Sequence, residues 1–501
     1  MPELPPDGAL YVVRAGIDTY QEPVVYIRAD SAVVRSEGFE AQARVQVTVG
    51  ARSIIATLNV VLGDLLQPHQ VALSESAWHK LEPAPGTLAF MSHPDPVSSM
   101  QHVRAKIYGN KLGRSEYLEI MRDCIAGRLA DIELAAFLTA CATRELDLDE
   151  TAALTGAMVD VGARLDWGGG IVLDKHCVGG LAGNRTTPIV VAIVAACGYR
   201  IPKTSSRAIT SPSGTADTME TLAPVALDLE HMRRVVEQEG GCIVWGGSVS
   251  LSPADDVLIR VERPLDFDSD AQLVASVLSK KIAAGATHVL LDLPVGPSAK
   301  VRSKETAVRL SEQLTKTAAR FGLHARVFFS DGTQPVGRRI GPALEARDVL
   351  AVLECAPDAP QDLRSRALDL AGALLELAGV SDGRAVAQAT LDSGRALAKF
   401  NAICEAQGGR RTPPLAPHVK PVLARSAGVI RAIDNRALSR LAKLAGAPTA
   451  PAAGIEMHVK LGQAIEVGEP LFTVHAETPG ELEYALEYEA HHSRIIEIGE
   501  P

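Results

Sequence analysis

The sequence has no Cys-x-x-Cys pair, no stripe of basic residues and no uninterrupted apolar run of transmembrane length. Its seven cysteines are scattered, which predicts reduced thiols in a cytosol and no zinc site. The formal net charge of −10, with no basic residues interleaved with aromatic ones, argues against nucleic-acid binding. The first residues lack the basic and apolar regions of a signal peptide, so we expect a cytoplasmic protein with no membrane partner.

Two familiar nucleotide-binding fingerprints are also missing. No Gly-x-x-x-x-Gly-Lys-Ser/Thr sequence occurs, and the run Gly168–Gly170 precedes an apolar strand instead of following one. These absences argue against a P-loop NTPase and against a dinucleotide-binding dehydrogenase. The composition, 47% hydrophobic and 22% charged over 501 residues, is typical of a globular protein of two to four domains.

Four segments with different patterns follow one another, which predicts a multidomain protein of the α/β and α+β classes. Residues 1–92 alternate short β-rich runs with turn residues and predict a small β domain. A helical period over residues 98–166 predicts a packed helical bundle. Residues 167–405 alternate apolar strands with helices, which predicts a mostly parallel α/β sheet domain. The strands expected there are Ile171–Leu173, Cys242–Val244, His288–Leu293 and Arg326–Ser330.

A Gly- and Pro-rich stretch, residues 406–424, reads as a linker into a last α+β domain over residues 420–501. We expect this domain to end in short strands. Two of its segments, Val459–Gly462 and Val467–Leu471, resemble the hammerhead of biotinyl and lipoyl carriers. No lysine lies in a Met-Lys-Met-like hairpin tip, so we do not expect a swinging-arm function.

The most informative segment is 171–188, where an apolar strand runs through Asp-Lys-His into a glycine-rich turn and an apolar helix. Glycines let the backbone approach a ligand, and the N–H groups of a helix start attract negative charge. The candidate ligands are Lys175, His176, Gly179, Gly180, Gly183, Thr186 and Thr187. The segment predicts a phosphate site, and the alternative is an ordinary strand-to-helix turn.

Two more polar clusters follow along the chain. Pro202–Asp217 is dense in hydroxyl groups that suit oxyanion contacts, although Thr215 or Asp217 could serve only to cap a helix. Asp266–Lys281 opens with acidic residues and places Ser276 and Lys280 on one helix face. The alternative role of Asp268 in this cluster is a helix N-cap.

Three motifs occur in the order and spacing of the thymidine phosphorylase/AMP phosphorylase family: Asp174-Lys175-His176 with Gly179-Gly180, Ser206-Arg-Ala-Ile-Thr-Ser211 with Gly214-Thr215, and Val277-Leu-Ser-Lys280-Lys281. From the bundle helices to the C-terminus the chain resembles this family. The resemblance implies a pentosyltransferase: inorganic phosphate attacks the anomeric carbon of a nucleoside or nucleotide, and the base leaves. It also implies a homodimer or larger homo-oligomer, phosphate as co-substrate, and no cofactor or metal.

The resemblance assigns roles to individual residues. In thymidine phosphorylases the residues matching Lys175, Thr187, Ser205 and Thr215 hold phosphate beside the turn of Gly179 and Gly180, and those matching His176, Ser276 and Lys280 contact the pyrimidine. Two positions depart from that pattern. Cys177 stands where that family has a phosphate-binding serine, and the pyrimidine-contacting arginine matches Arg260 or Arg263 only with a gap.

The long N-terminal domain and the loop 296–303 are more similar to AMP phosphorylase, although long bacterial relatives are commonly named as thymidine phosphorylases. In AMP phosphorylase the position of Asp268 is the proton donor. Residues that match its nucleotide-binding positions are Gly180, Ser206, Arg207, Ala208, Ile209, Thr210, Ser211, Thr215, Ser276 and Lys300. Lys300 discriminates between the two activities, because a thymidine phosphorylase has a small uncharged loop there, whereas a 5′-phosphate favours a cation. Its alternative is a solvent-exposed lysine.

The sequence therefore predicts phosphorolysis of a nucleoside 5′-monophosphate such as AMP, giving base and ribose 1,5-bisphosphate. The nearest alternative is the thymidine phosphorylase reaction, which gives thymine and 2-deoxyribose 1-phosphate. Two other classes remain open. A phosphoribosyltransferase would need magnesium, for which Asp255-Asp256 is a candidate acidic pair, and a non-catalytic nucleotide-binding protein would bind without turnover.

Overall fold

The computed structural model describes residues 8–84, 86–208, 211–265, 269–492 and 494–500. The chain forms two compact units, one of residues 1–144 with 257–262, and one of residues 145–256 with 263–501. Among the helices within the described ranges, none combines the length and hydrophobicity needed to span a lipid bilayer.

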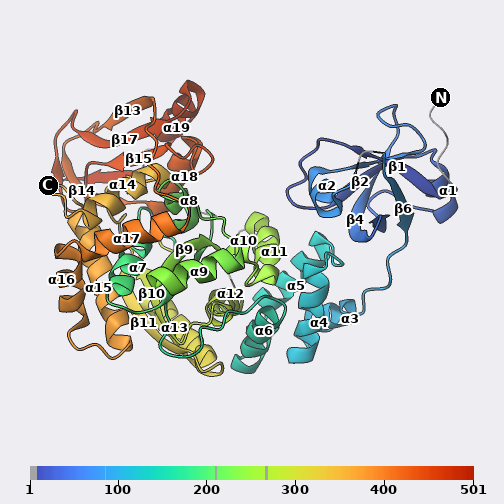
Figure 1. Cartoon of the computed structure of the whole chain (residues 1–501). Helices are drawn as coiled ribbons and strands as arrows, with labels where there is room; N and C mark the ends of the chain where they lie inside the picture. The colour runs from blue at the N-terminus through green and yellow to red at the C-terminus, as the bar shows by residue number, and fades with distance from the viewer. Residues whose placement is uncertain (1–7, 85, 209–210, 266–268, 493, 501) are drawn as a thin grey trace. The chain divides into compact units, whose positions relative to one another are not determined.

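The first unit opens with a closed six-stranded barrel in the order β1-β5-β2-β4-β3-β6 (Figure 1). The β1–β5 and β2–β4 pairs are parallel. Buried and partly exposed side chains alternate along β3, as expected for a strand with one face on a core. The elements are β1 (Ala9–Arg14), β2 (Val24–Arg28), α1 (Ala32–Glu37), β3 (Arg44–Val49), β4 (Arg52–Val61), β5 (Gln70–Leu73), α2 (Glu75–Leu81) and β6 (Leu88–Ser92).

Three helices follow in the first unit: α3 (Met100–Ile107), α4 (Arg114–Ile125) and α5 (Asp131–Thr143). The buried rings of Tyr117 and Phe137 meet edge to face, with 6.2 Å between their centroids. Residues 257–262, from the second half of α11 (Pro253–Glu262), belong to this unit. There the Arg260 guanidinium makes two hydrogen bonds to the Asp131 carboxylate, of 2.5 and 2.7 Å.

The second unit is built on five parallel strands. They form a three-stranded sheet, β11-β10-β7, and a pair, β8-β9, next to it. A single bridge between Val172 and Arg200 joins the starts of β7 and β8. The strands are β7 (Leu173–Cys177), β8 (Ile201–Ser205), β9 (Gly241–Trp245), β10 (His288–Val295) and β11 (His324–Asp331). Paired parallel strands end at the same edge, where ligands of such sheets bind.

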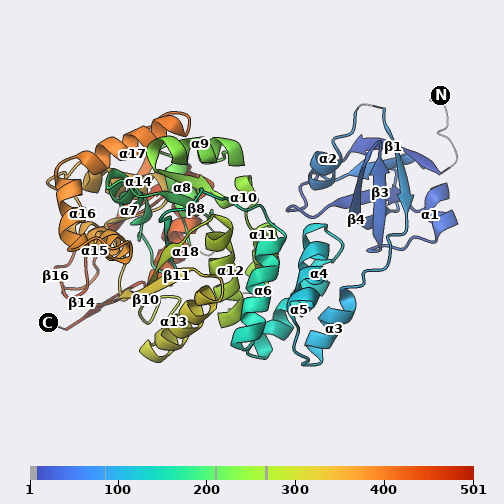
Figure 2. The same ribbon diagram turned by 60° about the horizontal axis from the view of Figure 1, so that its bottom comes forward.

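Helices cover both faces of this sheet, and β10 shows why. Val289, Leu291 and Leu293 point into a core shared with α12 and α13, whereas Leu290 points into a core shared with α7 and α15. Figure 2 shows these helices on either side of β10 and β11. A strand buried on both faces is a nearly continuous apolar run, as in residues 289–293.

The helices of the second unit are, in chain order, α6 (Leu148–Asp160), α7 (Thr187–Ala196), α8 (Thr215–Glu220), α9 (Leu229–Glu239), α10 (Gly246–Val249), the first half of α11, the short 3-10 helix η1 (Arg263–Leu265), α12 (Asp270–Ala283), α13 (Lys304–Ala319), α14 (Pro342–Leu353), α15 (Gln361–Leu377), α16 (Gly383–Asp392) and α17 (Arg395–Ala406). Capping side chains fix where several of them begin. The Asp147 carboxylate, for example, accepts a hydrogen bond of 2.9 Å from the Glu150 N–H at the start of α6.

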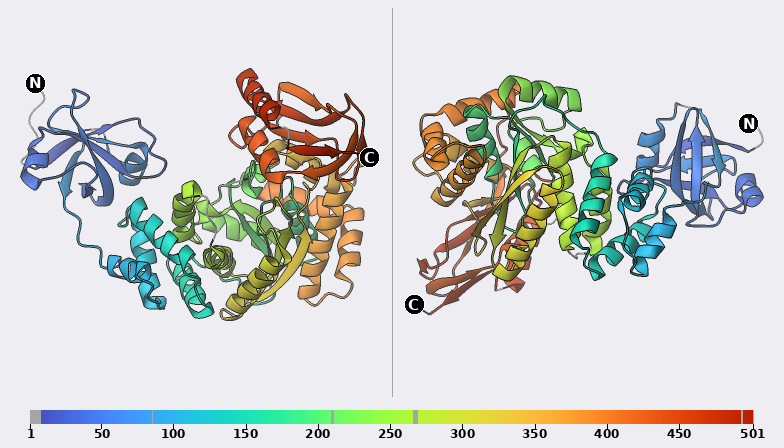
Figure 3. Two further views of the ribbon diagram at one scale, coloured as in Figure 1. Left: turned by 180° about the vertical axis from the view of Figure 1, so that it is seen from behind. Right: turned by 90° about the horizontal axis from the view of Figure 1, so that it is seen from below.

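The C-terminal part holds two small sheets and two helices, drawn in orange to red in Figures 1 and 3. Its elements are β13 (His418–Leu423), β14 (Gly428–Ile433), α18 (Asn435–Leu444), β15 (Gly454–Met457), β16 (Ala464–Ile465), β17 (Pro470–Ala476), α19 (Pro479–His491) and β18 (Ile496–Gly499). The four-stranded sheet has the order β12-β15-β17-β13. Its first strand, β12 (Arg339–Ile340), comes from the α/β segment and pairs with Ile455 and Glu456 of β15.

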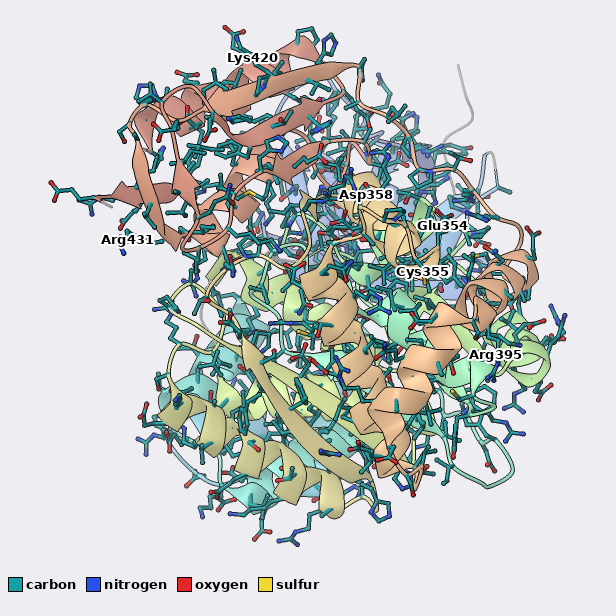
Figure 4. The ribbon with its side chains drawn as sticks, turned by 90° about the vertical axis from the view of Figure 1, so that its left-hand side faces the viewer. Glu354, Cys355, Asp358, Arg395, Lys420 and Arg431 are labelled. Atoms are coloured by element: carbon teal, nitrogen blue, oxygen red, sulfur yellow. The ribbon has the colours of Figure 1, made fainter. Side chains whose placement is uncertain are left out.

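Some elements differ from those the sequence predicts. The expected linker 406–424 contains β13, an edge strand, where Pro421 is tolerated because an edge strand needs no N–H on its outer side. The segment Val459–Gly462, which resembles a hammerhead strand, is a loop and turn, and the domain ends in α19 followed by β18. All seven cysteines are free, and Cys355, which follows α14, is exposed. Figure 4 shows Cys355 together with two other exposed residues, Lys420 of β13 and Arg431 of β14.

Candidate active site

The glycine-rich turn follows β7 directly, and its glycines are required by close backbone contacts. Gly180 and Gly183 have φ of +79° and +69°. A Cβ on Gly180 would lie 2.2 Å from the backbone nitrogen of Lys300, and one on Gly183 would lie 2.4 Å from the Val336 carbonyl oxygen. The turn leads into α7, which begins with Thr187 and Pro188. The loops after β7 and β10 therefore touch at Gly180.

Asp174, Lys175 and His176 lie within β7 and not in the turn, because the strand covers residues 173–177 instead of the expected 171–173. Lys175 is only 1% exposed. Its Nζ donates to the Thr186 hydroxyl at 2.7 Å and lies 3.4 Å from the Thr187 hydroxyl. Burial lowers the pKa of Lys175. Within the described residues no carboxylate forms an ion pair with this amine, although the charge of Asp292 acts on it from farther away and partly offsets the effect of burial.

Two hydroxyl groups at the end of β8 are buried. Thr204 Oγ1 and Ser205 Oγ make no hydrogen bond within the described part of the chain, and Ser205 is 8% exposed. Buried hydroxyls normally find partners. Because β7 and β8 are adjacent and parallel, they end at the same edge of the sheet, where Thr204 and Ser205, as consecutive strand residues, present their hydroxyls on opposite faces. They are suitable ligands for a bound oxyanion.

A buried ion network lies behind this edge. Asp174 is fully buried between two lysines, with Lys281 Nζ 2.9 Å from Oδ2 and Lys203 Nζ 3.9 Å from Oδ1. The same Oδ1 accepts the backbone N–H of Lys175 at 2.7 Å. Burial, and next the charge of Lys281, lowers the pKa of Lys203 far below its usual value. Asp174 thus holds both lysines and the start of the Lys175 backbone in place.

His176 is neutral at physiological pH. Burial, followed by the charges of Lys281, Lys203, Lys280 and Lys175, lowers its pKa well below the ordinary value of 6.5. A neutral imidazole donates one hydrogen bond and accepts another. It can therefore contact a base without adding charge to the site.

The depressed pKa of His176 predicts a pH dependence of stability. In the unfolded chain the imidazole takes up a proton below about pH 6.5, whereas in the folded protein it stays neutral. The contribution of the neutral His176 to the free energy of unfolding is therefore complete above pH 6.5. It is lost as the pH falls, by about 1 kcal/mol at pH 5.5. His176→Gln should reduce the difference in urea stability between pH 7.5 and pH 5.5. The exposed His491→Gln serves as control, and an unchanged pH dependence in His176→Gln would contradict the assignment.

Cys177 occupies the last position of β7 as a protonated thiol. Burial, with the charge of Asp292, raises its pKa to about 12. Asn184 Nδ2 lies 3.4 Å from the sulfur. A thiol is a weaker hydrogen-bond donor than the serine expected from the resemblance, so Cys177 can contribute little to binding an anion.

The loop residues 206–208 and 211–214 are joined by Asp217. Asp217 Oδ2 accepts the N–H groups of Ala208 and Gly214 at 2.7 and 2.8 Å. The Arg207 guanidinium pairs with Asp217 and Glu220 and lies 5.0 Å from the Trp245 ring. The predicted residues Ile209 and Thr210 lie outside the described residues. Ser206 and Ser211 are part of this loop, where Ser211 Oγ donates to the Ser213 carbonyl.

Thr215 follows this loop as the first residue of α8, and its hydroxyl accepts a hydrogen bond of 2.7 Å from Arg185. Arg185 lies between the glycine-rich turn and α7. Two of the predicted phosphate-binding segments are therefore joined directly by a side chain that the sequence motifs do not include.

Helix α12 carries Ser276 and Lys280 on one face, as predicted. Lys280 forms an ion pair with the buried carboxylate of Asp255. Burial would lower the pKa of Lys280, but the charge and hydrogen bond of Asp255 outweigh it and raise the pKa. The N-cap of α12 is Ser269, and Asp268, the predicted proton donor, lies outside the described residues.

The candidate acidic pair for magnesium is engaged elsewhere, since Asp255 is the partner of Lys280. Over the ranges that the structure describes, no group of three or more His, Cys, Asp or Glu side chains is arranged to hold a metal ion. Of the two candidate arginines, Arg260 is bound to Asp131, and Arg263 lies in η1, where its charge lowers the pKa of Lys443 after the effect of burial.

Comparison with known proteins agrees with this architecture. The descriptions that match are "Glycosyl transferase family, helical bundle domain" over residues 100–162, "Glycosyl transferase family, a/b domain" over residues 169–397, and "Pyrimidine nucleoside phosphorylase C-terminal domain" over residues 429–495. The chain is 60% identical over 494 residues to a protein of Hahella chejuensis named "Putative thymidine phosphorylase", covering 98% of both. A protein of Legionella pneumophila with the same name is 56% identical over 494 residues, covering 98% of this chain and 96% of the relative.

The chain belongs to the thymidine phosphorylase/AMP phosphorylase family. It is an enzyme, a glycosyltransferase of the nucleoside phosphorylases that transfers a pentosyl group. Its fold is also similar to that of anthranilate phosphoribosyltransferase from Thermus thermophilus, with a TM-score of 0.51, 23% identity, and coverage of 61% of this chain and 98% of that chain. At this identity the likeness concerns the fold alone.

The pairing of several charged residues was not predicted from the sequence, although Asp174 and Lys281 stand in its motifs and Lys203 lies in its second polar cluster. Lys203, Lys281 and Asp174 form the buried network, and Arg185 pairs with Glu345. A charged side chain inside an otherwise apolar strand, or beside a glycine turn, is the signal that could have predicted these ion pairs. Charged residues are almost never fully buried unless they are paired.

Proposed function

We propose that the protein catalyses the phosphorolysis of a nucleoside 5′-monophosphate. An oxygen of inorganic phosphate forms a bond to the anomeric carbon, the bond from that carbon to the base breaks, and the base leaves with a proton. The products are the free base and ribose 1,5-bisphosphate. Phosphate is the co-substrate, and we propose no cofactor.

The contact between Gly180 and Lys300 carries this proposal. The backbone of Lys300 lies so close to Gly180 that a Cβ there would be 2.2 Å from its nitrogen. Two lysines therefore flank one glycine turn, Lys175 from β7 and Lys300 from the loop after β10. A nucleotide phosphorolysis needs sites for two phosphate groups, one for the nucleophile and one at the 5′ position. Lys175 suits the first and Lys300 the second.

The ligands of the nucleophile in this proposal are Lys175, Thr187, Ser205 and Thr215, with the N–H groups of the turn around Gly179. The Ser205 hydroxyl, which has no hydrogen-bond partner among the described residues, and the buried amine of Lys175 support it. Holding the nucleophile in place lowers the entropic cost of the reaction. Fixed hydrogen-bond donors also stabilise the negative charge that shifts in the transition state.

The departing base is held, in this proposal, by Ser276, Lys280 and the neutral His176. Asp268 is proposed as the proton donor on the resemblance to AMP phosphorylase. Because Lys280 is charged and held by Asp255, it can donate a hydrogen bond to an oxygen or nitrogen of the base.

The test incubates the protein and phosphate with AMP, CMP, uridine and thymidine separately and measures the released base. We expect turnover of a 5′-monophosphate. Lys300→Ala should raise the KM for that nucleotide roughly 10- to 100-fold, the value of one charge-assisted contact, without changing nucleoside turnover. Lys304→Ala, at the exposed start of α13, is the matched control. Equal nucleotide KM values in Lys300→Ala and the wild type would refute the nucleotide proposal.

Thymidine phosphorolysis is the second candidate. It is favoured by the names of the relatives and by the description of the C-terminal domain. The engagement of Arg260 by Asp131 weighs against it, because that arginine is one of two candidates for the pyrimidine contact. Release of thymine with no release of base from AMP or CMP would select this function.

A further inference from the structure

Arg185 is a nearly buried arginine at the junction of three segments. It follows the glycine turn and precedes Thr186 and Thr187, the two hydroxyls near Lys175 Nζ. Its guanidinium donates three hydrogen bonds in three directions: Nε to Glu345 Oε2 at 2.7 Å, Nη1 to Thr215 Oγ1 at 2.7 Å, and Nη2 to the Ser213 carbonyl at 2.8 Å. One side chain thus joins the glycine turn, the 213–215 segment and α14.

The charge of Arg185 is already balanced. Its partner Glu345 is 1% exposed and also accepts the Thr218 hydroxyl at 2.9 Å, while Arg185 itself is 12% exposed. A neutral, buried pair adds little net attraction for phosphate. What the pair fixes is geometry, since a guanidinium donates in a rigid fork.

The contact with Thr215 has a consequence for its hydroxyl hydrogen. A threonine hydroxyl has one hydrogen and two acceptor lone pairs. Here Oγ1 accepts from Arg185, so its own hydrogen must point away from the guanidinium. Within the described residues the Thr215 hydroxyl makes no hydrogen bond besides the one from Arg185. It is available to a bound oxyanion.

We propose that Arg185 is a positioning residue for phosphate, which turns the hydroxyl of Thr215 toward the bound anion and thereby sets the KM for phosphate. This inference rests on the part of the proposed function that places phosphate at the glycine turn. It does not depend on which base or nucleotide is the substrate.

A double-mutant cycle tests this directly. Arg185→Met and Thr215→Val are each expected to raise the KM for phosphate about 10-fold, the value of a hydrogen bond to a charged ligand. If Arg185 acts through Thr215, the double variant should have a KM no higher than that of the more severely affected single variant. The matched control is Arg320→Met, whose partner Asp149 is exposed. Multiplication of the two effects in the double variant would overturn the proposal.

Chemical rescue separates positioning from a structural role. Millimolar guanidinium chloride should lower the phosphate KM of Arg185→Ala toward the wild-type value, but not that of Arg185→Ala with Thr215→Val. Rescue of both variants, or of neither, would overturn the proposal. If the alanine variant is poorly folded, Arg185→Lys replaces it, because lysine keeps the charge but not the fork, and its phosphate KM should also rise.

The substrate used in these assays is whichever of AMP, CMP, uridine or thymidine the wild type cleaves. If only thymidine is cleaved, the nucleotide proposal fails while the cycle still tests Arg185. If none is cleaved, the phosphate-induced rise in Tm is measured for the wild type, Arg185→Met, Thr215→Val and the double variant. Equal rises in the wild type and in Arg185→Met would then overturn the positioning role.

Discussion

Lys175→Met is expected to lower kcat/KM for phosphorolysis by roughly 10³-fold, at the upper end of the loss seen when one preorganised electrostatic contact is removed. Lys175 is 1% exposed, and among the described residues its Nζ makes hydrogen bonds to the hydroxyls of Thr186 and Thr187. In such a poorly solvated place a full charge attracts an anion much more strongly than at the surface. Methionine is similar in length and removes the charge without opening a large cavity.

The measurement is the initial rate of base release as a function of phosphate concentration. Most of the loss should appear at low phosphate, because the lysine holds the nucleophile. Lys316→Met is the control, since Lys316 and its partner Glu312 are both exposed on the same helix. A reduction of less than about 10-fold in Lys175→Met would exclude this lysine as the main phosphate ligand.

Asp174→Asn should destabilise the second unit by about 3–5 kcal/mol, the cost of removing one partner from a buried ion pair. The substitution leaves the ammonium group of Lys281, 2.9 Å from the carboxylate, without this counter-ion, and removes the carboxylate that lies 3.9 Å from Lys203 Nζ. Both lysines are buried and cannot turn to water. The effect is measured as a shift of the urea unfolding transition.

A second variant shows whether the cost arises from the unpaired charge. Asp174→Asn combined with Lys281→Met removes one cation along with the anion, so part of the stability should return. The control is Asp149→Asn, which breaks an exposed pair with Arg320 and should cost less than about 1 kcal/mol. If Asp174→Asn behaved like Asp149→Asn, the network would not be a stabilising element.

The sequence predicted those features that local patterns determine. The apolar run from His288 identified a strand that the structure extends to Val295, because a strand buried on both faces is a nearly continuous apolar run, interrupted here at Asp292. Lys175 and Thr187 were found as a pair of candidate ligands, since a glycine turn between a strand and a helix is a local feature. The structure places Lys175 Nζ 3.4 Å from the Thr187 hydroxyl.

The features that were missed depend on contacts distant in sequence. Strand β8, Ile-Pro-Lys-Thr-Ser, was read as a polar cluster because it has a single large apolar residue, yet all five positions are buried. Lys203 is tolerated there because Asp174 comes from the neighbouring strand. Arg185 finds its partner 160 residues away, at Glu345. No local pattern predicts such pairs.

The pairing of β12 with β15 means that the boundary between the α/β segment and the C-terminal domain is shared in three dimensions. Arg339 and Ile340 complete a sheet whose other strands come after residue 417. The carbonyl groups of Val336 and Arg339 also lie so close to Gly183 that they leave no room for a Cβ there. From the same C-terminal domain, Asn435 donates at 3.0 Å to Ser298 in the loop of Lys300. For protein engineering, a chimaera that exchanges the C-terminal domain between relatives must therefore exchange residues 336–341 with it, or lose the support of two substrate loops at once.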